Sequence, residues 1–137
     1  MRDLYHNLAV TQVLKPATVT TDQTSSAIDM QGFSSLAVLF AIGQSGDTLS
    51  GSVYWTFKLQ HSDDNSTYTD VAVSDLHNSS ATVVVDAAAE DETVLKFGYN
   101  GNKRYVKALA VKTGTHSSGT PLAMIAVQGT PSLAPVA

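Results

Sequence analysis

The sequence predicts a single-domain, all-β protein: an antiparallel β-sandwich with a jelly-roll-like arrangement of about seven or eight strands. Two observations predict it. Segments rich in apolar and β-branched residues recur at nearly even spacing along the 137 residues, separated by turns rich in Gly, Ser, Asn and Asp. No long stretch repeats its apolar residues with the period of a helix. We place the domain at residues 17–131, between an N-terminal arm, 1–16, and a C-terminal tail, 132–137.

Residues 1–16 are expected to form an arm because their apolar residues mix loosely with polar ones and Pro16 closes the segment. Such an arm would pack on a neighbouring molecule, and deleting residues 2–15 would then leave the fold intact. The tail is rich in proline and alanine, so it is expected to be poorly ordered or to dock on a partner.

The expected strands begin with residues 18–24, which are β-branched, and 25–30, which lead to a Gln-Gly turn. Residues 33–42 form a continuous apolar segment, and burial on both faces would place this strand centrally in its sheet. The clearest strand is 53–60, because its apolar residues alternate strictly with mostly polar ones and neighbouring side chains point to opposite faces. Its expected core face consists of Val53, Trp55, Phe57 and Leu59.

The polar run at residues 62–66 is expected to form a hairpin turn to a second strand, because Ser, Asp and Asn side chains bond readily to their own backbone. Later strands are expected where alternating or β-branched residues are bounded by turn residues, at 81–86, 93–99, 103–113 and 122–128. Residues 87–92 are either a loop or one helical turn.

The composition excludes several classes of protein. The chain has no cysteine, so disulfides and thiolate metal sites cannot contribute. The N-terminus lacks the apolar run and cleavage site of a secretory signal, and the longest apolar run, 36–42, is too short to span a bilayer. We therefore expect a protein made in the cytoplasm that has no membrane partner.

Charge argues against a nucleic-acid partner, because the net charge is −4 and such a partner requires a basic face. The charges are also unevenly distributed. Residues 63–92 contain eight acids and no Lys or Arg, whereas the chain after Glu92 contains five bases and no acid. The two halves either pair within one domain or complement each other between identical subunits in a ring or lattice.

No catalytic or metal-binding constellation is recognisable, which predicts a protein that is not an enzyme and has no cofactor. The four histidines lack the spacing of zinc ligands: His6, His61, His77 and His116. Asp63, Asn65, Thr67 and Asp70 resemble half of a calcium loop, but Tyr68 stands at the glycine position and Ser74 at that of the bidentate Glu. A hairpin turn explains these residues better.

Three segments carry a resemblance to a known group of proteins. They are 27–33 (AIDMQGF), 58–64 (KLQHSDD) with 69–71 (TDV), and 98–106 (GYNGNKRYV). Together they resemble small virion structural proteins of tailed bacteriophages and prophages, in particular capsid decoration, or cement, proteins. The resemblance implies a non-enzymatic protein on the outer surface of a phage head, with the major capsid protein as partner and self-association, with a trimer favoured.

Two alternatives remain open. The chain could be a tail or head-to-tail joining component, which the same resemblance allows. It could also be a carbohydrate-binding β-sandwich module in which Trp55 and the tyrosines stack on sugar rings, although Trp55 shares its face with the expected core.

The candidate interface residues lie in the arm and at two charged positions. Arg104 is either a cation at a strand end beside a turn or the partner of an acid within residues 86–92, such as Asp91. The full set is Arg2, Leu4, Tyr5, Leu8, Asp91 and Arg104.

Overall fold

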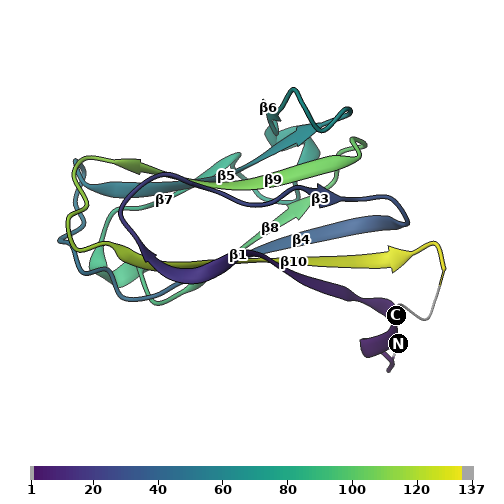
Figure 1. The fold of residues 1–137 in the computed structure, drawn as a ribbon, viewed down its shortest axis with the longest axis horizontal. Helices are drawn as coiled ribbons and strands as arrows, with labels where there is room; N and C mark the ends of the chain where they lie inside the picture. Colours follow the sequence, from purple (N-terminus) through teal and green to yellow (C-terminus); the bar gives the residue numbers. More distant parts are fainter. Residues whose placement is uncertain (1, 134–137) are drawn as a thin grey trace.

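The computed structural model describes residues 2–133 and confirms an all-β fold of two antiparallel sheets packed face to face (Figure 1). The strands are β1 (Ala9–Val19), β2 (Gln23–Thr24), β3 (Ile28–Asp29), β4 (Phe33–Ile42), β5 (Tyr54–Ser62), β6 (Thr69–Asp70), β7 (Thr82–Val85), β8 (Val94–Tyr99), β9 (Tyr105–Thr113) and β10 (Thr120–Pro131). Three single 3-10 turns complete the described elements: η1 (Tyr5–Asn7), η2 (Val73–Asp75) and η3 (Ala88–Glu90). Residues 87–92 are therefore a loop that contains one such turn.

The strand order is that of a jelly roll. Sheet A has the order β1-β10-β4-β8, and sheet B has β9 and β5 at its centre, with β2 and β3 along one edge and β6 and β7 along the other. Counting each pair of short edge strands as one interrupted strand gives eight positions, ordered 1-8-3-6 and 2-7-4-5. The short, interrupted edges of sheet B offer few free backbone groups for pairing with another chain.

The core lies between the sheets and is built from the inward residues of their central strands. Trp55 and Phe57 are fully buried, as the alternation of β5 predicts. The Phe40 ring of β4 meets the rings of Phe57 and Phe97 edge to face, with centroids 5.1 Å and 5.4 Å apart. Such geometry is favourable for aromatic pairs, so these contacts lock β4, β5 and β8 together across the two sheets.

The N-terminal arm is shorter than the sequence suggests. Residues 9–16 belong to β1, which pairs with β10 over its whole length and has Val13 in the core. The regular alternation is lost because the register shifts twice, between Gln12 and Leu14 and again before Ala17. Only residues 2–8 lie outside the sheet, so the expected arm of 1–16 is corrected to this shorter segment.

The C-terminal end of the domain lies close to the expected boundary at residue 131. β10 runs to Pro131, and the backbone N–H of Ser132 donates to the carbonyl of Gly32 at 2.8 Å, so the chain remains tied to the sandwich. Of the expected tail, residues 134–137 lie outside the part of the chain that the structure describes.

β4 occupies the central position that its apolar sequence predicts, between β10 and β8. One face, which includes Val38 and Phe40, is fully buried in the core. The other face consists of Ala37, Leu39 and Ala41 and is half-buried on the outside of sheet A. The residues of β4 are therefore apolar on both faces because one face lies in the core and the other forms an apolar outer surface.

A side chain protects the free edge of β8. The amide of Asn78 donates to the carbonyl of Lys96 at 2.9 Å and accepts from the N–H of Gly98 at 3.0 Å. Because these two bonds imitate a neighbouring strand, they satisfy backbone groups that the edge would otherwise expose.

Candidate interaction surface

The three segments that carry the sequence resemblance meet at one end of the sandwich. β1 begins and β10 ends at this end, on the right in Figure 1. Arg104 from the third segment binds Asp29 from the first, and Lys103 forms an ion pair with Asp63 of the hairpin at 2.7 Å. Residues far apart in sequence thus hold this end together through charged contacts.

Arg104 is the centre of this arrangement. Its Nε and Nη2 donate to the two carboxylate oxygens of Asp29 at 2.9 Å each, and Nη2 also donates to Oε1 of Gln31 at 2.7 Å. The bond to Arg104 lowers the pKa of Asp29, and the bond to Asp29 raises the pKa of Arg104. Of the two interpretations of Arg104, a pair with an acid within residues 86–92 is wrong, because its partner is Asp29.

The hairpin segment is also fixed by hydrogen bonds. Oδ1 of Asp64 accepts from the backbone N–H groups of Ser66 and Thr67 at 2.9 Å and from the Ser62 hydroxyl at 2.7 Å. These bonds, led by that from Thr67, lower the pKa of Asp64 to about 2. Asn65 adopts a positive φ of 58°. The Asp/Asn-rich sequence is thus explained by turn geometry, as expected.

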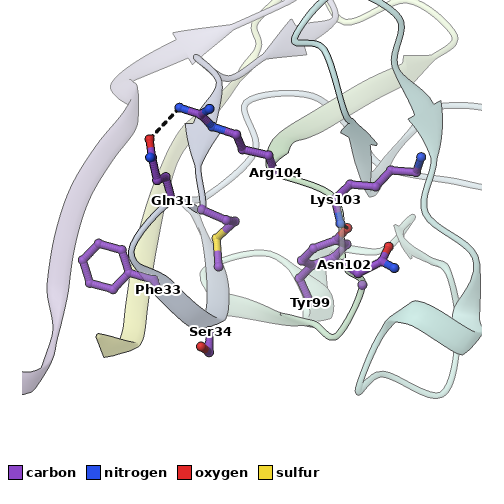
Figure 2. A pocket seen from close by; sticks show the side chains of 9 residues that line it. Gln31, Phe33, Ser34, Tyr99, Asn102, Lys103 and Arg104 are labelled. Carbon is purple, nitrogen blue, oxygen red and sulfur yellow. Dashed lines mark hydrogen bonds between the residues drawn. The ribbon is translucent and has the colours of Figure 1, made fainter. Parts of the chain in front are cut away.

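A shallow hollow of about 420 Å³ opens between the turn before β4 and the loop before β9. Figure 2 shows Gln31 and Arg104 pointing toward one another at one side of it, with Lys103 directed away from them. The hydroxyl of Tyr99 accepts from the backbone N–H of Lys103 and lies 2.8 Å from Nδ1 of the buried His61. The main cations here are already paired, which gives the hollow little net charge.

The terminal segments place exposed apolar side chains at the same end. Leu4, Tyr5 and Leu133 are 56%, 84% and 84% exposed. Arg2 is exposed as well, whereas Leu8 is half-buried and lines a second hollow beside Gly129 on the outer face of sheet A. Large apolar residues that remain exposed together indicate a surface suited to a partner.

Asp91 lies at the opposite end of the sandwich from Arg104, because β8 runs between them. Its side chain is buried, with 7% of the residue exposed, and Oδ2 accepts from the backbone N–H of Ser45 at 3.0 Å. Asp91 therefore fixes a loop rather than presenting its charge outward.

The opposite end is held by a buried polar network that the sequence analysis missed. The indole N–H of Trp55 donates to the Thr120 hydroxyl at 3.1 Å, which donates to the Ser45 hydroxyl at 2.9 Å. Nearby, the carboxylate of Asp47 accepts from three consecutive backbone N–H groups at 2.7–3.0 Å, and these bonds, led by that of Ser118, lower its pKa. This carboxylate joins two loops 70 residues apart, which no local sequence signal reveals.

The histidines do not gather. His61 and His116 are buried, at the two ends of the sandwich, and His6 bonds to Asp3 in the N-terminal segment. Within residues 2–133, no three His, Asp or Glu side chains are grouped so as to hold a metal ion. In the same described part, no helix is long and apolar enough to cross a membrane.

The uneven charge distribution is partly used within the domain. Lys103 of the basic half pairs with Asp63 of the acidic half, whereas Arg104 pairs with Asp29, which lies outside the acidic half. Lys58 and Asp70 form a further pair within the hairpin. Of these three pairs among the described residues, one joins the two halves.

The comparison with solved structures gives an informative match, whereas the comparisons of sequence do not. No protein-family model and no curated protein matches the chain. Among solved structures, the fold is similar to that of the SPBc2 prophage-derived protein YomS, with a TM-score of 0.52 and 14% identity over 89% of this chain and 92% of that one. The chain therefore shares its overall architecture with a prophage-derived protein.

Proposed function

We propose that the protein is a non-enzymatic structural component of a tailed-phage or prophage particle, and specifically a decoration protein bound to the outside of the head. Its partners in this role are the major capsid protein and further copies of itself, with a trimer as the form that suits the threefold positions of a shell. Its location is the capsid surface.

Two features support this role. The fold match extends over nearly the full length of a prophage-derived protein. In addition, the jelly roll is an architecture that capsid proteins and lectins use to present rigid surfaces. The alternative of a carbohydrate-binding module is not supported by Trp55, because this residue is fully buried and cannot stack on a sugar ring.

The observation that carries the docking role is the set of exposed apolar side chains on the terminal segments. Leu4 precedes η1 and Tyr5 begins it, both outside the sheet, and Leu133 follows β10 at the same end. Covering such side chains with a partner would gain about 25 cal/mol for each Å² of apolar surface removed from water. These side chains would then attach the rigid sandwich to the shell.

The first experiment asks whether the protein is part of a particle and where. Particles from the host that carries the gene are purified, their proteins are identified by mass spectrometry, and gold-labelled antibodies locate the chain. Many copies on the head are expected. Label on the tail or at the neck would support the joining role instead, and absence from intact particles would contradict both.

A second experiment tests the docking residues. The double variant Leu4→Ser, Tyr5→Ser is added to particles that lack the protein, and bound protein is measured after sedimentation. Binding should be strongly reduced. The control is Val73→Ser, which removes a 48% exposed apolar side chain on η2, outside the terminal segments, and should bind normally. Equal binding of the two variants would contradict the docking role.

A further inference from the structure

The outer face of three strands of sheet A, β10, β4 and β8, is largely apolar, although the exposed face of an antiparallel sheet usually carries polar side chains. β5 in sheet B follows that rule, with Thr56, Lys58 and Gln60 facing out. On sheet A the outward positions of the three strands β10, β4 and β8 are mainly apolar or small. They include Ala37, Leu39, Ala41, Val94, Ala123 and Ile125.

A groove of about 570 Å³ lies on this face. Ala41 and Ala123 are among its lining residues, and Val94, which is 63% exposed, lies at the β8 side. These three residues form one row across the sheet, because Ala123 pairs with Ala41 and Ala41 pairs with Val94. We define this as the central row.

We propose that a second copy of the chain packs on this face, related by a two-fold axis that lies in the interface along the central row. Such an axis reverses the strand direction and stacks each strand on its own copy. A residue two positions before the central row then lies over the residue two positions after it on the other copy.

The residues on either side of the central row complement one another under this operation. Leu39, Ile125 and Lys96 form the row on one side, as their pairing shows. Gly43, Pro121 and Glu92 form the row on the other side, joined by backbone hydrogen bonds. The axis therefore places Leu39 over Gly43 of the second copy, so that a large side chain lies over a position without one. It also places Ile125 over Pro121, so that two apolar side chains meet.

Charge complementarity selects a second copy as the occupant. The same operation places Lys96 over Glu92 of the other molecule, and it does so twice because the contact is symmetric. Both side chains are exposed, and within residues 2–133 neither takes part in an ion pair. Opposite charges at these two positions fix the register of the contact and disfavour other registers.

The size of the face sets the strength of the contact. Three rows spaced about 6.8 Å apart across three strands about 4.8 Å apart cover about 300 Å² per copy. A stable interface usually buries about 800 Å² per partner. The contact should therefore be a reversible dimer that forms with increasing concentration rather than an obligate one. This inference does not depend on the proposed virion role.

The first test uses a cysteine at the axis, in a chain that has no cysteine of its own. Under mild oxidation Val94→Cys should form a disulfide-linked dimer rapidly, because residue 94 faces its own copy. The matched control is Val84→Cys, an exposed valine on an edge strand of sheet B, which should cross-link much more slowly. Equal rates for the two variants would overturn the proposal.

The second test reverses the charges and measures the dimer dissociation constant by sedimentation equilibrium, with circular dichroism to verify folding. Glu92→Lys or Lys96→Glu alone should raise the dissociation constant about threefold or more, and the double reversal should restore it. A chain that stays monomeric at all concentrations, or an oligomer that is indifferent to these charges, would overturn the two-fold contact.

Discussion

The guanidinium of Arg104 binds both carboxylate oxygens of Asp29, 75 residues earlier in the chain, at 2.9 Å each. This bidentate pair joins β3 to the loop before β9. The backbone is coupled to it, because the N–H of Met30 donates to the carbonyl of Arg104 at 2.7 Å.

Replacing Arg104 with Lys should loosen this end of the molecule locally, because an ammonium group cannot bind two oxygens in the same planar geometry. We expect faster hydrogen exchange at the N–H of Met30. The midpoint of thermal unfolding should change little, because the two side chains are 46% and 45% exposed. Asp70→Asn, which breaks an exposed pair elsewhere, should leave exchange at Met30 unchanged; a similar effect of both variants would contradict the local role.

Thr120→Val should destabilise the protein although it hardly changes the shape of the side chain. The variant lacks the hydroxyl that accepts from Trp55, so a fully buried N–H is left without a partner. The expected loss in unfolding free energy is about 1–3 kcal/mol, measured by urea denaturation. Thr56→Val, on the half-exposed face of β5, should cost less than about 0.5 kcal/mol.

His61 should make stability depend on pH below about 6.5. Burial lowers the pKa of His61 below its ordinary value of 6.5, with a smaller lowering from Lys103 and opposing effects of Asp75 and Asp63. As the pH falls below 6.5, the unfolded chain therefore binds a proton that the folded chain resists, and stability declines. Above 6.5 this contribution is constant.

The check for this prediction is a series of urea denaturation curves from pH 8 to pH 5. His61→Gln should flatten the decline, and its curve at pH 8 shows whether it is folded. Bonding lowers the pKa of the carboxyls of Asp29, Asp64 and Asp70, so their contributions are lost only below about pH 4. If the stability of His61→Gln declines as much as that of the unmodified protein, the pH dependence arises from other groups.

Two N-terminal deletions should behave differently. Removal of residues 2–8 leaves every residue of β1 in place and should preserve the fold. Removal of residues 2–15 eliminates the buried Val13 and much of the pairing with β10, and should cost several of the about 5–15 kcal/mol that stabilise a domain. Circular dichroism and thermal unfolding distinguish them. Equal stability of the two deletions would show that β1 is dispensable.

The sequence predicted regular strands well and irregular ones poorly. The alternation of β5 correctly placed Trp55 and Phe57 in the core, because a strand without bulges keeps a period of two. The part of β1 up to Pro16 has the sequence of an arm for the opposite reason, because its two register shifts and Pro16 break that period.

The contacts of the candidate surface were harder to predict than the fold. The segments containing Asp29 and Arg104 were both singled out, but nothing in either indicates that they meet, because this depends on β3 and β9 being neighbours. The sequence offers Arg104 either no partner or an acid within residues 86–92, and neither interpretation includes Asp29. Long-range charge pairing follows from topology, which single-sequence patterns do not encode.

The amide of Asn78 has a consequence for how far assembly can proceed. Because it occupies the edge of β8, and because β1 at the other edge of sheet A is bulged and contains Pro16, neither border is a good template for an incoming strand. Growth into a filament by strand addition is thereby discouraged. The two-fold contact proposed above would instead close into a dimer, because both copies use the same face and none is left over for a repeating contact.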